Sequence, residues 1–250
     1  MNLALALGGG AARGAFHLGF LHFCEENNIQ IQAYSGSSIG SIISCSHASG
    51  VSAKEQLKIF SSKDIRQALK FNYFRNGLLK IDASNKIIKD LLPISKIEDI
   101  PKPVYVNAYD VKEKKLHYFD SGDTITLCMA SSAIVPLLKP VKYKNMYLID
   151  GGLFDNIPIK PLENKNYNIF SVDLFPKKYA NPLLRLNPVK IIKKKLFTQL
   201  YENHKHSLEN THHYLGSKHI RNFSLYTFQE IDECFKLGFK EAQNHFLDIL

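Results

Sequence analysis

Short apolar runs alternate with helical patterns along the first part of the chain. Residues Asn2–Leu7 form an apolar run, and a helical pattern with its apolar positions on or near one face follows to about Asn27. A second apolar run covers Ile29–Tyr34, and Ile39–Ser49 then carries the small residues that let a helix pack closely against a sheet. This alternation predicts an α/β fold.

In the rest of the chain, predicted strands again alternate with predicted helices, and some of these strands form antiparallel hairpins. Alternating apolar positions predict β-hairpins over residues 104–119 and 141–149, with a helix at about 124–133 between them. A buried strand is expected at 169–175, and a last amphipathic helix is expected after Thr227. Together these elements predict a three-layer α/β/α sandwich.

A glycine-rich turn, Gly8-Gly9-Gly10-Ala11-Ala12-Arg13-Gly14, joins the first strand to the first helix. Such a turn presents backbone N–H groups to an anion at a helix N-terminus. A loop that binds a nucleoside triphosphate would need Gly-Lys-Ser/Thr here, so that interpretation fails. The G-x-G-x-x-G pattern of dinucleotide-binding proteins fits the turn only weakly. Binding of a developing oxyanion fits better, because a nucleophile turn follows the next strand.

That nucleophile turn is Gly36-Ser37-Ser38-Ile39-Gly40, a G-x-S-x-G pattern directly after the second apolar run. A serine on a sharp strand-to-helix turn needs strained backbone angles and close packing, which side chains at Gly36 and Gly40 would obstruct. The pattern therefore predicts a nucleophile elbow, with Ser38 as its nucleophile.

A third motif, Asp150-Gly151-Gly152, follows later in the chain. With the glycine-rich turn, the nucleophile turn and this motif, the chain resembles the patatin-like phospholipases of the small bacterial type. The stretch Asp150–Pro158 resembles the family's aspartate motif, Ala130–Pro136 resembles the small-residue helix before it, and the resemblance covers about residues 1–175. It implies a Ser-Asp dyad of Ser38 and Asp150. It also implies an oxyanion loop of Gly9, Gly10, Ala11 and Arg13, with Gly36, Gly40, Gly151 and Gly152 supporting the motifs.

The loop departs from the family pattern at Ala11, where a third glycine is usual. An alanine keeps its N–H, so an oxyanion hole remains available, but a positive φ angle there is costly. Arg13 has three candidate roles: it neutralises local charge, fixes the loop, or meets a lipid phosphate.

The base that activates Ser38 is the open question, because histidine is the usual choice. His47 lies about 13 Å along the predicted helix from Ser38, out of reach, and His17 is expected to be a packed helix histidine. Asp150 is a weak base at its ordinary pKa, so burial has to raise that pKa. A Ser-Asp-His α/β-hydrolase is the alternative, but that class places several strands before its elbow and this chain has one.

Composition sets the remaining expectations. With 250 residues and 45% hydrophobic content, the chain predicts one domain over 1–250, with a motif-bearing core at about 1–175 and a C-terminal extension at about 176–250. Four dispersed cysteines indicate buried thiols in a reducing compartment. With no signal peptide pattern and no apolar run long enough to span a membrane, we expect a cytoplasmic protein.

The net charge is +9, and lysines gather in residues 176–197 among apolar residues and prolines. We expect either a linker there or a segment that contacts anionic membranes peripherally. No nucleic-acid-binding pattern appears, so no nucleic acid partner is expected. We expect His204, His206, His212, His213 and His219 to be exposed surface histidines that bind no metal, and no cofactor is implied.

The sequence thus predicts a serine hydrolase that cleaves fatty-acyl esters of phospholipids or other lipids through an acyl-enzyme. An acyltransferase or thioesterase with the same dyad is one alternative. A non-catalytic lipid-binding or regulatory protein is the other alternative, because Ala11 stands where the family usually has a third glycine.

Overall fold

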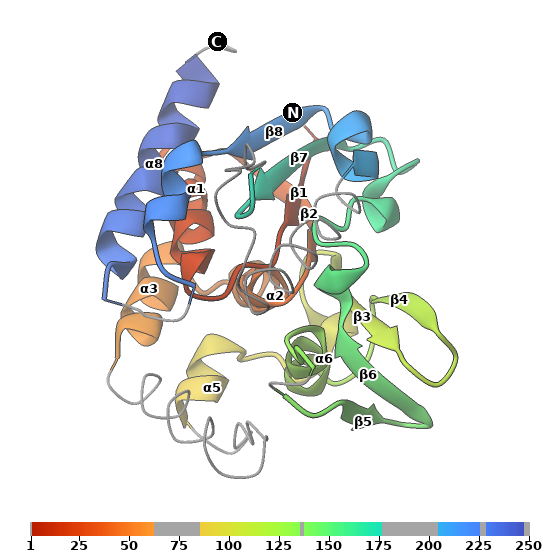
Figure 1. Ribbon diagram of the computed structural model, residues 1–250. Coiled ribbons are helices and arrows are strands. Elements are labelled where there is room, and N and C mark those ends of the chain that lie inside the picture. The colour runs from red at the N-terminus through yellow and green to blue at the C-terminus, as the bar shows by residue number, and fades with distance from the viewer. Residues whose placement is uncertain (1, 63–85, 136–137, 177–204, 226–228, 248–250) are drawn as a thin grey trace, which may run out of the picture.

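The computed structural model describes residues 2–62, 86–135, 138–176, 205–225 and 229–247. Within them, one mixed sheet of eight strands forms the centre of the molecule (Figure 1). The strands are β1 (Leu3–Leu7), β2 (Ile31–Gly36), β3 (Val104–Asp110), β4 (Lys115–Phe119), β5 (Val141–Tyr143), β6 (Met146–Asp150), β7 (Asn168–Asp173) and β8 (His213–Gly216). Their order is β5-β6-β3-β2-β1-β7-β8, and β4 pairs with β3.

The helices of the described residues follow the same alternation. They are α1 (Gly14–Glu26), α2 (Ile39–Ala48), α3 (Ala53–Ser61), α5 (Lys86–Leu91), α6 (Thr124–Ser131) and α8 (Ile231–Leu247). Short 3-10 turns are η1 (Ala11–Arg13), η2 (Ile97–Asp99), η3 (Gly151–Leu153), η4 (Lys160–Leu162) and η5 (Lys218–Asn222).

The parallel half of the sheet centres on β1. This strand lies between β2 and β7 and is parallel to both. All five of its residues, Leu-Ala-Leu-Ala-Leu, are buried. A continuous apolar run of this kind is typical of a central parallel strand covered on both faces.

The edge of β3 is shared by two strands that approach from opposite directions. β2 runs parallel to β3 and ends with Gly36 beside Val106, whereas β6 runs antiparallel and ends with Asp150 beside Ala108. Both Val106 and Ala108 also pair with β4, so β4 occupies the other edge of β3. The carboxyl ends of β2 and β6 therefore meet head to head along one edge.

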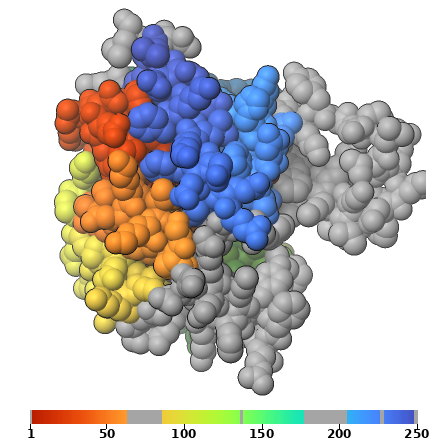
Figure 2. Space-filling view, turned by 90° about the vertical axis from the view of Figure 1, so that its left-hand side faces the viewer, coloured from red at the N-terminus to blue at the C-terminus, as the bar shows by residue number. Residues whose placement is uncertain are grey.

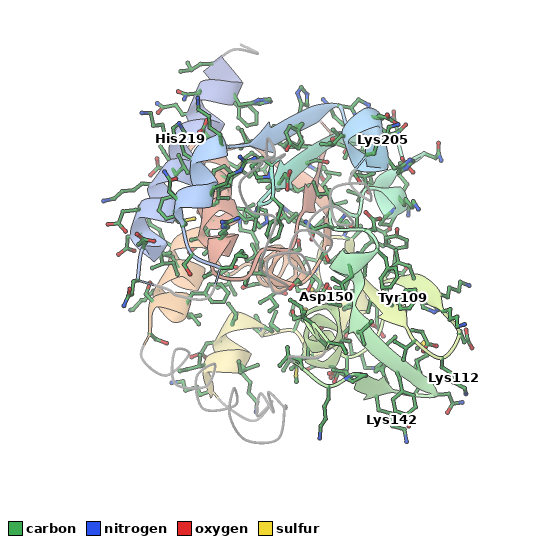
Figure 3. All side chains as sticks on the ribbon, viewed as in Figure 1. Tyr109, Lys112, Lys142, Asp150, Lys205 and His219 are labelled. Carbon is green, nitrogen blue, oxygen red and sulfur yellow. The ribbon has the colours of Figure 1, made fainter. Side chains whose placement is uncertain are left out.

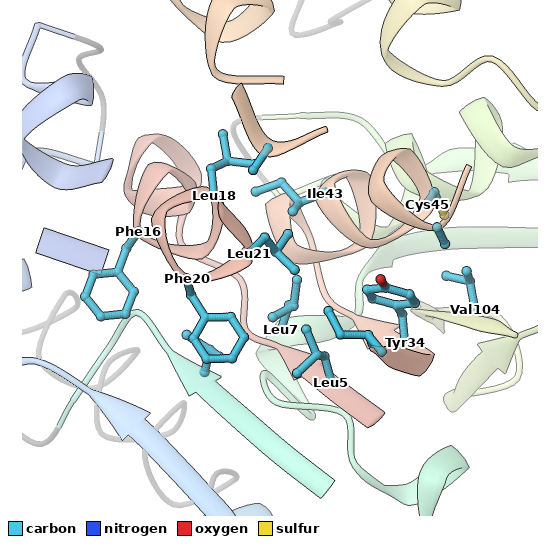
Figure 4. Packing of buried hydrophobic residues seen from close by; sticks show 14 of the residues in the cluster. Leu5, Leu7, Phe16, Leu18, Phe20, Leu21, Tyr34, Ile43, Cys45 and Val104 are labelled. Carbon is cyan, nitrogen blue, oxygen red and sulfur yellow. The ribbon is translucent and has the colours of Figure 1, made fainter. Parts of the chain in front are cut away.

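One face of the sheet is covered by α1 and α2. Leu5 and Leu7 of β1 pack against Phe16, Leu18, Phe20 and Leu21 of α1 and Ile43 of α2 in one apolar cluster (Figure 4). The sequence places the apolar residues of α1 on one face, but the helix is buried on all sides from Gly14 to Cys24. The reason is α8, which packs on its outer side (Figure 2).

Two glycines let α1 and α8 approach each other at backbone distance. A Cβ atom on Gly19 would lie 2.0 Å from the Phe235 carbonyl oxygen, and one on Gly238 would lie 2.1 Å from that of Phe16. Any side chain at either position would push the two helices apart.

The opposite face of the sheet carries a thinner layer. Ala4, Ala6 and Tyr105 form a second apolar cluster with Ile157, Ile159 and Leu162, the last of which belongs to η4. A helical turn at residues 205–210 lies against this layer, where the Ser207 hydroxyl donates to the Ile157 carbonyl at 2.6 Å. Helices thus lie on both sides of the sheet, and the three-layer prediction is confirmed.

The structure differs from the sequence prediction near the C-terminus. Residues His213–Gly216 form β8, parallel to β7, where only exposed histidines were expected. His213 is half-buried because its ring stacks on Phe170 at 5.5 Å, whereas His206, His212 and His219 are exposed. Most of the expected interfacial segment 176–197, together with Thr227, lies outside the described residues. No helix among the described residues is long and apolar enough to cross a membrane.

Candidate active site

Ser38 lies on the turn between β2 and α2, in the strained backbone conformation that such a turn requires. Its φ and ψ angles are 52° and −123°, values rare for a residue with a side chain. A Cβ atom on Gly36 would lie 2.4 Å from the Gly40 carbonyl oxygen, and one on Gly40 would lie 2.1 Å from the Leu7 carbonyl oxygen. The two glycines of G-x-S-x-G are therefore required by close packing.

A chain of hydrogen bonds joins this turn to the loop after β6. The Ser38 N–H donates to the Ser131 hydroxyl at 2.8 Å, and that hydroxyl donates to Asn107 Oδ1 at 3.4 Å. Asn107 Nδ2 donates in turn to the Asp155 carbonyl oxygen at 2.6 Å. Sequence reasoning missed Asn107, although an asparagine inside the apolar run Val104–Val111 was a signal, since a buried amide needs partners.

Asp150 lies at the end of β6 (Figure 3), and its side chain contacts that of Ser38 on the nucleophile turn. Its side chain is 4% exposed, and its Oδ1 accepts the Gly152 N–H at 2.7 Å. Burial raises the pKa of Asp150 to about 7, although hydrogen bonds from the Gly152 N–H and the Ser38 side chain act to lower it. The structure thus brings the predicted pair, Ser38 and Asp150, into direct contact.

The glycine-rich loop passes directly over the nucleophile turn. A Cβ atom on Gly9 would lie 3.1 Å from Ser38 Cβ. The Gly9 N–H already donates to Asn156 Oδ1 at 3.1 Å, and Asn156 Nδ2 returns a long hydrogen bond to the Gly9 carbonyl at 3.5 Å. Asn156 therefore holds this loop, and in this structure the Gly9 N–H, which was expected to serve the oxyanion hole, is bonded to its side chain.

The next two amides of the loop are available. In the described part of the chain, the N–H groups of Gly10 and Ala11 have no acceptor, whereas the Arg13 N–H bonds to the Gly10 carbonyl at 3.1 Å. Ala11 has a φ angle of 48°, so the alanine adopts the conformation that a glycine would adopt without cost.

Arg13 ties the loop to the rest of the molecule. Its Nε donates to the Phe223 carbonyl at 3.0 Å, and its guanidinium also donates to the Leu174 carbonyl at 3.2 Å. The same group lies 5.6 Å from the centre of the Phe175 ring. Of the three roles considered for this side chain, these contacts support that of fixing the loop.

The two histidines nearest to Ser38 in sequence have other partners. His17 is fully buried and its Nε2 lies 2.7 Å from the Gly8 carbonyl oxygen; burial lowers its pKa to about 4, so the ring is neutral and donates. His47 bonds to the Tyr34 hydroxyl at 2.7 Å and to Glu25 at 3.0 Å. His17 therefore holds the glycine-rich loop through the Gly8 carbonyl, and His47 belongs to a separate cluster with Tyr34 and Glu25.

The loop after Asp150 is anchored by a second buried carboxylate. Asp155 accepts a hydrogen bond from the Tyr118 hydroxyl at 2.5 Å, and burial raises the pKa of Asp155 to about 6. Phe154 beside it stacks on Tyr109 with ring centres 3.7 Å apart, yet remains 40% exposed. An aromatic surface therefore begins four positions after Asp150.

Known proteins share both the sequence motifs and the fold. An uncharacterized NTE family protein of Mycobacterium tuberculosis is 28% identical over 170 residues, which cover 67% of this chain and 47% of the relative. Lysophospholipase NTE1 of Coccidioides immitis is 31% identical over 180 residues, covering 69% of this chain and 11% of that protein. The chain thus spans less than half the length of these relatives.

A solved structure of low sequence identity has the same fold. The crystal structure of VipD from Legionella pneumophila matches 99% of this chain and 67% of its own with a TM-score of 0.56 at 13% identity. The family model described as patatin-like phospholipase matches residues 5–163, which include the glycine-rich loop, the nucleophile turn and the aspartate loop. This chain belongs to the patatin-like phospholipase family.

Proposed function

We propose that this protein hydrolyses fatty-acyl esters of lipids through an acyl-enzyme on Ser38. The observation that carries the proposal is the contact between a strained, accessible serine and a buried carboxylate with a raised pKa. Ser38 Oγ attacks the acyl carbonyl carbon while Asp150 accepts its proton, and the protonated Asp150 then gives that proton to the leaving alcohol. Water attacks the acyl-enzyme with Asp150 again as base, which frees the fatty acid.

The environment of Asp150 suits this task. A carboxylate at its ordinary pKa would hold the serine proton too weakly to act as an efficient base near neutral pH. A pKa of about 7 brings the base close to the working pH while leaving a large share of it ionised. The cost is a buried charge, which the Gly152 amide and the Ser38 side chain offset in part through hydrogen bonds.

The negative charge on the attacked carbonyl oxygen needs donors, and the proposal assigns this role to the Gly10 and Ala11 amides. Preorganised backbone N–H groups stabilise such an oxyanion without reorganising during the reaction. Gly9 and Arg13 support them instead: Gly9 through Asn156 and Arg13 through its two carbonyl contacts.

Lipid is the proposed substrate class because of the family and the surface near the site. NTE1 is named a lysophospholipase, and the exposed Phe154–Tyr109 stack beside Asp150 presents an apolar face to an acyl chain. We propose that the protein works in the cytoplasm with peripheral contact to membranes. Transfer to an acceptor other than water, and thioester cleavage, use the same dyad and are distinguished by the products formed.

The first prediction tests the dyad. Ser38→Ala and Asp150→Asn should each lower the hydrolysis of a fatty-acyl ester by about 10³-fold or more, because nucleophile and base act as one unit. Ser46→Ala is the matched control: it removes a buried α2 hydroxyl that has no partner in the described residues, and full activity is expected. A fluorophosphonate probe should label wild type and not Ser38→Ala.

Two results would contradict the dyad. Folded wild-type protein that resists the fluorophosphonate would favour the non-catalytic lipid-binding alternative. Loss of activity in His17→Ala or His47→Ala equal to that in Ser38→Ala, with Asp150→Asn still active, would transfer the role of base to a histidine.

The second prediction concerns pH. The pKa of Asp150 is raised above the value of 3.8 that it takes when unfolded, so between pH 4 and 7 the folded state binds more protons and loses stability as pH rises. Asp150→Asn lacks this loss. The free energy of unfolding of the variant minus that of wild type should therefore increase as pH rises, by up to about 4 kcal/mol in total, and level off at about pH 8, where Asp150 is almost fully ionised. Urea unfolding at pH 5, 6, 7 and 8 measures it. A difference that does not change with pH would show that Asp150 titrates normally.

The third prediction concerns Ala11. Ala11→Gly should retain activity and be equally or slightly more stable, because glycine adopts a φ of 48° freely. Ala11→Pro deletes the donor and also forbids this φ, so Ala11→Val, which keeps the N–H but disfavours the angle, is the matched control. We expect kcat to fall by about 10² for proline and by clearly less for valine. Equal kcat values for folded proline and valine variants would remove the Ala11 amide from the oxyanion hole.

The fourth prediction concerns residues 176–197, proposed as the membrane-contacting segment. Changing Lys190, Lys193, Lys194 and Lys195 to glutamine should weaken sedimentation with anionic liposomes, at about 1 kcal/mol for each lysine close to the surface. Added salt should weaken wild-type binding in the same way, because charge attraction is screened. Equal binding of both proteins, or binding that salt does not change, would leave the segment without this role.

A further inference from the structure

A cluster of three potential metal ligands lies at the outer end of the β3–β4 hairpin, outside the site described above. Asp110 ends β3, His117 lies in β4, and Glu113 belongs to the turn that joins the strands. One ligand atom from each lies within 4.8 Å of the other two. Figure 3 shows the neighbouring Lys112 at this tip, well apart from Asp150.

The register of the hairpin explains why these residues meet. Ala108 pairs with His117 and Asp110 pairs with Lys115. Side chains two positions apart on a strand share a face, so Asp110 and His117 are diagonal neighbours on the same side of the sheet. Glu113 comes from the turn between the two strands and completes the cluster over it.

Two buried polar atoms in the cluster have no partner. Asp110 is fully buried, and its Oδ1 accepts the N–H groups of Lys112 at 3.0 Å and Tyr147 at 3.2 Å. Its Oδ2 and the Nε2 atom of His117 are also shielded from solvent, yet neither has a hydrogen-bond partner in the described residues. Leaving a buried carboxylate oxygen unsatisfied is costly, so these two atoms indicate a missing ligand.

Charge supports a cation as that ligand. Lysines surround the hairpin tip, but among the described residues none of them forms an ion pair with Asp110 or Glu113. Within the part of the chain that the structure describes, the two carboxylates therefore lie beside an imidazole and have no ion-pair partner. A bound divalent ion would supply both the charge and the missing contacts.

We propose that Asp110, Glu113 and His117 bind a divalent transition-metal ion of the zinc type. One nitrogen and two carboxylate oxygens suit zinc, which accepts mixed nitrogen and oxygen ligands, whereas calcium and magnesium prefer oxygen ligands alone. Water completes the coordination. The ion links the turn to both strands. Asp110 also accepts a hydrogen bond from the Tyr147 N–H, which connects the site to β6.

Two of the three ligands are held in place by the fold. Asp110 is fixed by its two backbone contacts, and the His117 ring is stacked on Phe119 with ring centres 5.6 Å apart. Glu113 is exposed on the turn, so it is the ligand that can adjust its position to the distance of about 2.0–2.2 Å at which zinc holds its oxygen and nitrogen ligands.

The sequence did not reveal this cluster because its histidine lies outside the histidine-rich stretch. Histidines gather in sequence between His204 and His219, whereas His117 stands far from any other histidine. The spacing Asp110, Glu113, His117 matches no common metal motif, and only the hairpin register brings the three side chains together.

The test is zinc binding by the full, tag-free chain. Zn²⁺ alone is titrated against a chromophoric zinc indicator, with Ca²⁺ in a parallel titration, and melting temperature is recorded with and without Zn²⁺. We expect one Zn²⁺ per chain, a rise in melting temperature, and no competition by Ca²⁺. Glu113→Gln and His117→Ala should each weaken Zn²⁺ binding by about tenfold or more.

Controls separate this site from other ligands and from misfolding. Glu113 is exposed, so Glu113→Gln should melt like wild type without Zn²⁺ and lose only the Zn²⁺-dependent rise. His219→Ala removes an exposed histidine elsewhere and should bind Zn²⁺ like wild type. Absence of saturable Zn²⁺ binding in wild type, or equal affinity in wild type, Glu113→Gln and His117→Ala, would overturn the proposal and leave the cluster to a bridging water.

Discussion

The geometry of the site depends on how β3 shares one of its edges. β2 ends against the first half of that edge and β6 ends against the second half, so their carboxyl ends face each other. Whatever follows β2 must then meet whatever follows β6. The chain places the nucleophile turn after the first and the aspartate loop after the second, which brings Ser38 and Asp150 together although they are far apart in sequence. Asn107 lies at the junction: it bonds directly to the aspartate loop, and it is linked to the nucleophile turn through the Ser131 hydroxyl, so the strand that aligns the two loops also fixes their spacing.

Local patterns were enough to predict most of the fold and the residues of the proposed site. The apolar run Asn2–Leu7 predicts the first strand, and β1 forms there with all of its residues buried. Gly36 and Gly40 predict a turn that only glycines can pack, and the backbone contacts bear this out. In each case the physical requirement lies within a few residues of sequence, so a single chain reveals it.

Features that depend on partners distant in sequence could not be predicted in the same way. The sequence shows a helix with one apolar face at α1, but not that α8 would cover the other side. It shows four loop amides, but not that Asn156 would take the one on Gly9. β8 was missed because a strand of four residues that begins with His213 and Tyr214 gives little periodicity, and its parallel pairing with β7 is a contact that the sequence does not reveal.

Three unfavourable conditions are concentrated at the site: a serine and an alanine at positive φ, and a carboxyl group shielded from solvent. Each costs on the order of 1–3 kcal/mol or more and persists only where surrounding contacts enforce it. Here they are enforced by Arg13, Asn156 and Asn107, none of which the proposal involves in bond making. Stability spent at the site is thus recovered by side chains whose role is to hold loops in place.

The close contact between α1 and α8 means that the part of the chain that carries the motifs does not contain the whole hydrophobic core. The family match ends at residue 163, before β7 and α8. Phe20 of α1 lies inside the match, but the rings it packs on belong to Phe170 and Phe246, at 4.8 and 6.4 Å between centres. A chain cut at the end of the match would keep every residue of the proposed chemistry and present an aromatic surface to water. Such a fragment is a candidate for aggregation, so the smallest useful version of this protein is set by its aromatic core and extends to its last helix.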